Sequence, residues 1–457
     1  MGGSSLPSMG LLSRRALLAG TAALAAAACT PSEDPTTPSR SPSPSLTPTA
    51  GPFGLAVPST IRVTVHEGPI GTSIIDGAAA RLRENFPGVD IQVKAVPSIT
   101  DEVGPTLATT PPDLVNNSGD GRLALGSIAA ELLPLDELLE SPNLAGTPIR
   151  DTLHTGALAP GLVDDQQLAM QYTLIVHGLW YSETLFSGHG WTPPQTWDDL
   201  YELGAAAAET GRTLFAWDPT HAGEYLDLVI ASAIKEDGHD LRRDLDNLAP
   251  DAWRNPAVER ILGQLRRLVQ SDQLAEYPDG SRERWASGGP LLCPGGATLL
   301  RQTKTTMRPD FMPTVTPVPT ITRAPKLPFA AIHSEADESF FVPRNAANPQ
   351  GGMELLRTLL SPEVAAEFSE LNELPTVIRG ATPESPALAS QVRLLADAGE
   401  NTFKWMFIKY YGLGEQTTAA MGEFLRGELN PAELIDQLQA MCDAVREDPD
   451  VVKYEVE

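Results

Sequence analysis

Short apolar runs alternate with amphipathic stretches from about residue 60 onward. The run IRVTV (61–65) is followed by a stretch whose apolar residues recur at helical spacing, and then by VDIQVKAV (89–96). A further apolar run at 113–115 leads into the polar turn NNSGDG (116–121). Strands that alternate with helices form parallel sheets with crossover helices. The pattern therefore predicts an α/β lobe that begins with a βαβ unit.

The rest of the chain predicts a second lobe of the same class. The segment 167–186 has the apolar centre of a buried strand, and Thr196-Trp197-Asp198-Asp199 is a capping box that begins a helix. The stretch NPAVERILGQLRRLV (255–269) places its apolar residues on one helical face. Because 457 − 58 leaves 399 residues after the N-terminal segment, which is too many for one ordinary core, we expect two lobes.

The N-terminal segment has the pattern of an export signal (1–28). Arg14 and Arg15 precede thirteen apolar or small residues, which are too few to span a bilayer, and the pair resembles a twin-arginine signal. The run Ala26-Ala27-Ala28-Cys29 resembles a lipobox, in which the thiol of Cys29 receives a lipid anchor. Ordinary signal cleavage, with the cysteine incidental, is the alternative.

A tether is predicted to follow the anchor over 29–58. This stretch is rich in Pro, Ser and Thr, a composition that stays extended and buries no core. An acylated cysteine followed by a stiff spacer holds a folded domain away from a membrane. We therefore expect a lipid-anchored protein at the outer face of the cell membrane.

Charge limits the partners. The chain has 33 Lys and Arg against 59 Asp and Glu, a formal net charge of −26. Such an excess of negative charge repels nucleic acid phosphates and anionic lipid headgroups. The composition thus excludes nucleic acid as a partner, leaves the lipid anchor as the contact with the membrane, and favours a neutral or cationic ligand.

Motifs for catalysis, cofactors or metals are weak. Gly119-x-Gly121-x-x-Ala124 has the geometry of a dinucleotide-binding turn, but no acidic residue ends a second strand about 20 residues later, so an ordinary turn is favoured. The seven histidines show no H-E-x-x-H spacing. Cys442 lies on the apolar face of a predicted helix and is predicted to be a buried free thiol, with a disulfide to Cys293 as the alternative. We expect no enzyme, no cofactor and no metal.

Five segments, spread in order along the chain, are more specific than any single motif. They are PPDLVNNSGD (111–120), VHGLWYSETLF with GHGWTPPQTWDDL (176–200), DNLAPDAW (246–253), FFVPRNAANPQGGMELLRTLLSPEVAAEF (340–368) and LRGELNPAELIDQLQAMCDAV (425–445). Together they resemble the family 1 extracellular solute-binding proteins, the lipoprotein receptors of ABC sugar importers. Within that family the segments are most similar to the N-acetylglucosamine/diacetylchitobiose-binding group.

The resemblance implies a two-lobed α/β fold of the periplasmic-binding-protein type II, with the ligand cleft between the lobes. It places three hinge crossings near 174–178, 324–328 and 376–380. The first lobe would then comprise 59–175 and 327–377, and the second lobe 176–326 and 378–457. The resemblance also implies a monomer whose partners are a carbohydrate and the permease subunits of an ABC importer.

Sugar capture requires an aromatic face for stacking and polar groups that pair with hydroxyls. Ligands of α/β sheets bind beyond the carboxyl ends of strands, so we expect the residues at strand ends to line the cleft. For the first-lobe residues, simple turn formation is the alternative. The candidates are His66, Glu67, Asn116, Asn117, Ser118 and Asp120 from the first lobe, and Trp217, Asp218, Glu224 and Tyr225 from the second lobe.

One stretch departs from the family pattern. Members of the group carry a sugar-stacking Trp, followed by acidic residues, in the stretch that matches CPGGATLLRQ (293–302). Here Thr298 occupies the place of that Trp, and no acidic residue follows within the stretch. Trp405, Tyr410 or Tyr411 would supply a substitute stacking face, with a core or interface position as the equal alternative for all three.

These observations predict a carbohydrate receptor that closes its lobes by hinge motion and has no catalytic step. The ligand predicted from the resemblance is N-acetylglucosamine or a chitooligosaccharide. A surface-anchored glycan hydrolase is one alternative, although no pair of catalytic carboxylates is identifiable. A degenerate receptor that is kept for protein contacts is the other alternative, and Thr298 motivates it.

Overall fold

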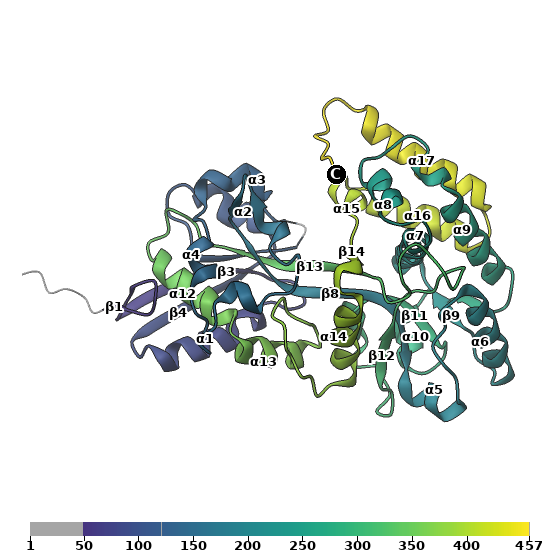
Figure 1. Cartoon of the computed structure of the whole chain (residues 1–457), viewed down its shortest axis with the longest axis horizontal. Coiled ribbons are helices and arrows are strands. Elements are labelled where there is room, and N and C mark those ends of the chain that lie inside the picture. The colour runs from purple at the N-terminus through teal and green to yellow at the C-terminus, as the bar shows by residue number, and fades with distance from the viewer. Residues whose placement is uncertain (1–48, 120, 457) are drawn as a thin grey trace, which may run out of the picture. The chain divides into compact units, whose positions relative to one another are not determined.

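The computed structural model describes residues 49–119 and 121–456. Its central feature is one mixed ten-stranded sheet that passes through both lobes (Figure 1). The strand order is β10-β9-β11-β8-β13-β5-β3-β4, with β12 paired to β8 and β14 paired to β13. Among the described residues, none of the helices is both long enough and apolar enough to cross a bilayer.

The predicted export signal, Cys29 and most of the predicted tether lie outside the described residues. The described end of the tether is folded, contrary to the prediction. Strands β1 (Thr49–Ala50) and β2 (Leu55–Ala56) pair with each other, and Leu55 is fully buried in the core against neighbouring apolar residues. Folded structure is therefore present from Thr49 onward among the described residues, because Leu55 in the Pro-rich stretch finds an apolar partner surface.

The first lobe is built on three parallel strands. Strand β3 (Ser59–His66) pairs along its whole length with β4 (Val89–Val96) and on its other side with β5 (Leu114–Asn117). Helix α1 (Ser73–Asn85) buries the apolar face that the sequence predicts. Strand β5 ends with Asn116 and Asn117, so these residues belong to the strand and not to the following turn.

Most of the remaining elements of the first lobe are short. The stretch 122–133 after β5 contains only α3 (Leu125–Ile128) and one 3-10 turn. The other elements are α2 (Ile99–Val103), α4 (Asp136–Glu140), β6 (Leu162–Val163), β7 (Gln166–Gln167), α12 (Pro349–Leu359) and α13 (Pro362–Asn372).

Two long strands pass between the lobes. Strand β8 (Met170–Ser182) pairs with β13 (Ile332–Phe341) up to Val176 and with β11 from His177 onward, so its partner changes within the predicted crossing at 174–178. Strand β13 pairs with β5 at its far end, so the second passage lies within β13, later in the chain than the predicted 324–328. The segment around Val377 is bonded to Tyr172 of β8 before the chain enters α14 (Pro386–Ala398).

The second lobe contains the other half of the sheet. Strands β9 (Phe215–Trp217), β10 (Leu274–Glu276) and β11 (Leu292–Gly296) are parallel, and β12 (Pro313–Thr316) is antiparallel to β8. Its remaining elements are α5 (Glu183–His189), α6 (Trp197–Glu209), α7 (Gly223–Asp237), α8 (His239–Asp246), α9 (Pro256–Val269), α10 (Ser281–Ala286), α11 (Thr298–Thr303), β14 (Thr402–Phe403), α15 (Phe407–Tyr410), α16 (Gly414–Leu425) and α17 (Pro431–Glu447).

Two local predictions in this lobe are confirmed. The Thr196 hydroxyl accepts from the Asp199 backbone N–H at 3.1 Å, and the Asp199 carboxylate accepts from the Thr196 N–H at 2.9 Å, which completes the predicted capping box of α6. Cys442 and Cys293 are buried free thiols, so the disulfide alternative is wrong.

Helix α12 lies so close to the backbone of the first lobe that only a glycine fits at the contact. A Cβ at Gly352 would lie 2.0 Å from the Asp113 carbonyl oxygen. We expect Gly352→Ala to lower the free energy of unfolding by about 1–3 kcal/mol, because the two backbones must separate. Urea denaturation monitored by circular dichroism measures the change.

Gly263→Ala is the matched control. Gly263 lies within α9, and a Cβ there would meet no atom within 4 Å. This substitution should stabilise the protein by roughly 0.5–1 kcal/mol, because alanine loses less conformational entropy than glycine in a helix. Equal effects of the two substitutions would show that the close approach at Gly352 is absent.

Candidate functional site

The carboxyl ends of β3 and β5 meet in a buried polar network around Glu338 of β13. The Asn116 side-chain amide donates to Glu338 Oε2 at 2.9 Å and to Ser118 Oγ at 3.0 Å, and its Oδ1 accepts from the His66 backbone N–H at 3.2 Å. Burial, reinforced by the charge of Asp337, raises the pKa of Glu338. We call His66, Asn116, Ser118 and Glu338 the first-lobe network.

The other first-lobe candidates lie differently. The Asn117 side chain bonds both backbone groups of Leu123, with its Nδ2 donating to the carbonyl at 2.9 Å and its Oδ1 accepting from the N–H at 2.8 Å. It therefore closes a turn, which was the alternative to ligand contact. Glu67 is exposed, and Asp120 lies outside the described residues.

The glycines of the Gly119-x-Gly121 motif serve close packing. Gly119 has a φ of 75°, and a Cβ there would lie 2.3 Å from His66 Nε2. A Cβ at Gly121 would lie 2.6 Å from Ser98 Oγ. The motif is accordingly the ordinary turn that the sequence favoured. Because Gly119 has no side chain, the His66 ring packs directly against the turn after β5.

The predicted stacking platform in the second lobe is not formed. Trp217 and Tyr225 are each 2% exposed and belong to the second-lobe core, and the Tyr225 hydroxyl donates to the Ala216 carbonyl at 2.8 Å. Strand β9 is an inner strand between β10 and β11, and helices cover it, so even its last residue is buried. Assigning Trp217 and Tyr225 to an aromatic face in the cleft is therefore wrong.

Asp218 also has a structural role. Its carboxylate is buried and accepts from the His221 backbone N–H at 3.0 Å, from the Ser281 N–H at 3.0 Å and from the Ser281 hydroxyl at 2.6 Å. His221 Nδ1 lies 2.9 Å from both of its oxygens. Burial alone would raise the pKa of Asp218, but these partners outweigh it and lower that pKa. Asp218 thus anchors α10 to the end of β9.

Glu224, at the start of α7, is the second-lobe candidate that retains a free polar atom. Its Oε1 accepts from Arg282 Nη2 at 2.6 Å, whereas its buried Oε2 has no hydrogen-bond partner in the described part of the chain. Asp227 follows nearly one turn later on the same helix. Burial raises the pKa of Glu224, with Arg282 opposing the shift, and burial also raises that of Asp227, with the charge of Glu224 adding to it.

Two histidines that the sequence analysis missed lie beside Glu224, one on each of the strands that pass between the lobes. The rings of His177 (β8) and His333 (β13) stack with centroids 4.3 Å apart, and His333 also stacks with Trp405 at 3.8 Å. Glu335 Oε1 lies 3.4 Å from His333 Nε2. The sequence signal that could have revealed this site is His177, a titratable residue within the otherwise apolar crossing at 174–178. We call His177, His333, Glu335, Glu224 and Asp227 the hinge cluster.

The electrostatics of the hinge cluster follow from its burial. Burial, with the charge of His333 adding to it, lowers the pKa of His177 to about 3, so this imidazole is neutral at physiological pH. Burial alone would raise the pKa of Glu335, but the contact with His333 and the charge of Lys409 lower it to about 2, so this carboxylate is charged. The cluster thus places an uncharged imidazole close to a carboxylate.

The remaining candidates are spread around this centre. Thr298 is half-buried at the first residue of α11, and Arg301 of the same helix donates to Asn372 Oδ1 and to the Pro69 carbonyl of the first lobe. Trp405 is 5% exposed against His333. Tyr411 stacks on Tyr454 with centroids 5.4 Å apart, which ties it to the C-terminal segment.

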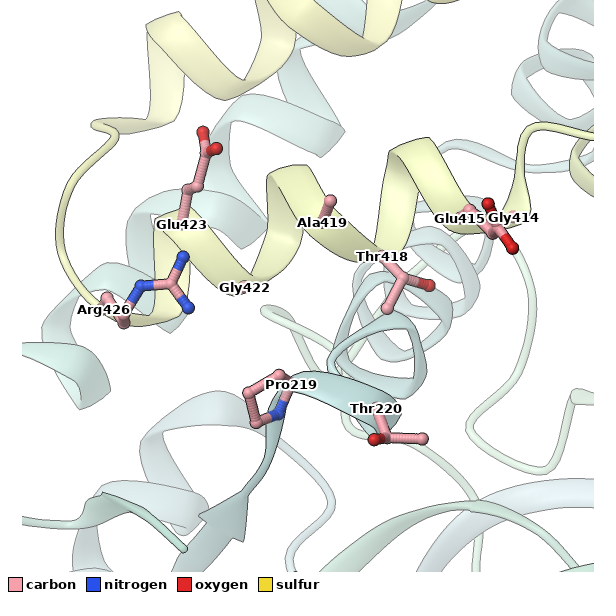
Figure 2. Close-up of a pocket in the computed structure, with 9 residues that line it drawn as sticks. All are labelled: Pro219, Thr220, Gly414, Glu415, Thr418, Ala419, Gly422, Glu423 and Arg426. Atoms are coloured by element: carbon pink, nitrogen blue, oxygen red, sulfur yellow. The ribbon is translucent and has the colours of Figure 1, made fainter. Parts of the chain in front are cut away.

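Strand β13 connects the two polar groups, because Glu335 belongs to the hinge cluster and Glu338 to the first-lobe network. A cavity of about 10 Å³ lies within the hinge cluster and is lined in part by His177, Glu224, Asp227 and His333. A separate surface cavity of about 510 Å³ lies between the end of β9 and α16 (Figure 2), and none of its lining residues belongs to either group.

Comparisons with known proteins agree with this architecture. Residues 68–366 match the family model described as bacterial extracellular solute-binding protein. The chain is 36% identical over 416 residues to the diacetylchitobiose binding protein NgcE of Streptomyces coelicolor, and the match covers 89% of each chain.

Solved structures show the same fold at low sequence identity. The apo form of RafE from Streptococcus pneumoniae is similar with a TM-score of 0.67 and 17% identity, over 84% of this chain and 97% of that one. The sugar-binding protein MalE from Xanthomonas citri is similar with a TM-score of 0.64 and 17% identity, over 84% and 97% of the two chains. The predicted type II fold of two α/β lobes is thereby confirmed.

Proposed function

Because the chain belongs to the bacterial extracellular solute-binding proteins, we propose that it captures a carbohydrate of the chitobiose type for an ABC importer. The observation that carries this proposal is the 36% identity to a diacetylchitobiose binding protein over 89% of both chains. Members of the family are receptors and not enzymes, so the chain is not a glycan hydrolase.

The geometry supports a sugar site along the centre of β13. The first-lobe network supplies amide, hydroxyl and carboxylate groups, and Glu224 supplies a carboxylate from the second lobe. Such groups pair with sugar hydroxyls once water is excluded. We propose Trp405 as the aromatic contact because it stacks on His333 of β13, although its ring, like that of Trp217, is buried in the second-lobe core. We keep His66, Glu67, Asn116, Ser118, Glu224, Thr298 and Trp405 as proposed contacts, and Asp120 as a sequence-based one.

The remaining parts of the proposal concern location and partners. The match to extracellular receptors supports export, and the run Ala26-Ala27-Ala28-Cys29 supports a lipid anchor at the outer face of the membrane. The protein would act as a monomer that delivers its sugar to permease subunits.

Differential scanning fluorimetry of residues 49–457 with a panel of sugars tests the function. We expect diacetylchitobiose to raise the melting temperature, because a ligand at 100 times its dissociation constant stabilises the folded form by about 2.7 kcal/mol. Raffinose and maltose are the controls and should cause smaller shifts. A shift with one of these sugars alone would contradict the chitobiose assignment and keep the carbohydrate class.

A degenerate receptor remains the second candidate, because Thr298 replaces the stacking Trp and the Trp217 and Tyr225 rings are buried. It predicts that no sugar changes the melting temperature while the protein still binds its permease subunits. Co-purification of the anchored protein with those subunits, with and without diacetylchitobiose, separates the two candidates.

A further inference from the structure

The hinge cluster contains two groups of metal-ligand side chains that share one histidine. In the first group, potential ligand atoms of His177, His333 and Glu335 all lie within 4.8 Å of one another, and in the second group the same holds for His177, Glu224 and Asp227. Imidazole nitrogens and carboxylate oxygens are ligands of Zn²⁺ and related divalent ions. We propose that the hinge cluster binds one divalent transition-metal ion of the zinc class, with His177, His333 and Glu335 as its protein ligands.

Unpaired polar atoms at this point give independent support. His333 is 3% exposed; its Nε2 lies 3.4 Å from Glu335 Oε1, and its Nδ1 has no hydrogen-bond partner among residues 49–119 and 121–456. The same is true of His177 Nδ1 and Glu224 Oε2, which are also shielded from solvent. Buried polar groups in native proteins are nearly always paired, and a bound ion is one of the reasons for an exception. A single metal ion would pair several of these atoms at once.

The cavity that His177, His333, Glu224 and Asp227 help to line has the size of an ion. Its volume of about 10 Å³ corresponds to roughly one water-sized probe. A pyranose ring does not fit in such a volume, so an ion here would lie beside the proposed sugar site, with which the hinge cluster shares Glu224. The alternative occupant is one water molecule, and the experiment below distinguishes it from a metal.

Positive side chains near the site leave ligand atoms free. Arg282 bonds Oε1 of Glu224, so that Oε2 remains available. Lys409 lies 4.0 Å from Oε2 of Glu335, whereas Oε1 faces His333. The carboxylates of Glu224, Asp227 and Glu335 therefore lie around the two imidazoles. Glu224 and Glu335, which contact positive side chains, each keep one oxygen atom for an ion.

The ligands also explain what an ion would do. His177 lies where β8 changes its partner strand, and His333 and Glu335 lie on β13 where it passes between the lobes. A metal held by both strands would fix their relative position at the hinge. The histidines are far apart in the sequence, so motif spacing does not reveal this site.

Equilibrium dialysis of the chelator-treated full-length protein against Zn²⁺, without any sugar, tests the proposal. We expect one Zn²⁺ per chain. Co²⁺ should give the visible absorption bands of a tetrahedral site with nitrogen ligands. Loss of an outer-shell partner typically weakens metal binding roughly 10–100-fold, so His177→Gln and His333→Gln should each weaken it at least about 100-fold.

His189→Gln is the matched control, because His189 is an exposed histidine at the end of α5. It should leave Zn²⁺ binding unchanged, and far-UV circular dichroism should show that all three variants are folded. The proposal is overturned if the wild-type protein binds no stoichiometric Zn²⁺, if the hinge variants bind it as well as the wild type, or if His189→Gln removes it. None of these outcomes depends on whether a sugar binds.

Discussion

Replacing Arg357 with methionine is expected to lower the free energy of unfolding by about 3–5 kcal/mol, because it leaves a buried carboxylate without its counter-ion. Glu354 on α12 is fully buried, and its Oε1 accepts from Arg357 Nε at 3.0 Å and also from Arg357 Nη2. Arg357 further donates to the Pro142 carbonyl at 2.9 Å. Equilibrium urea unfolding near neutral pH measures the loss.

Two comparisons identify the cause of that loss. The double variant Glu354→Leu with Arg357→Met should lose less stability than Arg357→Met alone, because no charge is then left buried. Arg308→Met removes the partner of an exposed pair, in which Arg308 Nη2 lies 2.7 Å from Asp310 Oδ2, and should change stability by less than about 1 kcal/mol. Equal losses for Arg357→Met and Arg308→Met would contradict the prediction.

Asp218→Ala is the second substitution with a large expected effect, in this case in the second lobe. It removes the acceptor of both Ser281 donors, whereas the His221 backbone N–H keeps the Asp218 carbonyl oxygen as an acceptor at 3.2 Å. Each buried donor left unpaired is expected to cost about 1–3 kcal/mol, so we expect a total loss of about 3 kcal/mol or more. Asp198→Ala is the control, because Asp198 is exposed in the first turn of α6 and should cost less than about 1 kcal/mol.

The pH dependence of Asp218 has a definite sign. Its pKa in the folded protein lies below the usual value, so its carboxylate stabilises the fold above about pH 4, and this contribution is lost as the pH falls toward the folded pKa. Asp218→Asn should flatten this part of the stability curve. Urea unfolding between pH 3 and pH 6 checks it. If Asp218→Ala instead weakened sugar binding and left stability unchanged, a direct ligand contact would replace the anchoring role.

Local interactions explain which elements the sequence determined by itself. The capping box of Thr196 and Asp199 and the one formed by Asn430 and Glu433 depend on residues three positions apart, so each helix start is encoded in a single short stretch. The apolar face of α1 follows from helical spacing in the same way. The alternation of strands and helices, together with five matching segments, was therefore enough to predict the two-lobed α/β fold.

Tertiary structure decided the composition of the site, because burial and proximity depend on residues that are distant in the sequence. Trp217 ends a strand as predicted, but the neighbouring strands and the covering helices place its ring in the core. His177 and His333 come together only through the antiparallel pairing of β8 with β13, and Glu338 reaches Asn116 through the pairing of β13 with β5. Strand pairing over such separations depends on the packing of the whole domain, and no local pattern encodes it.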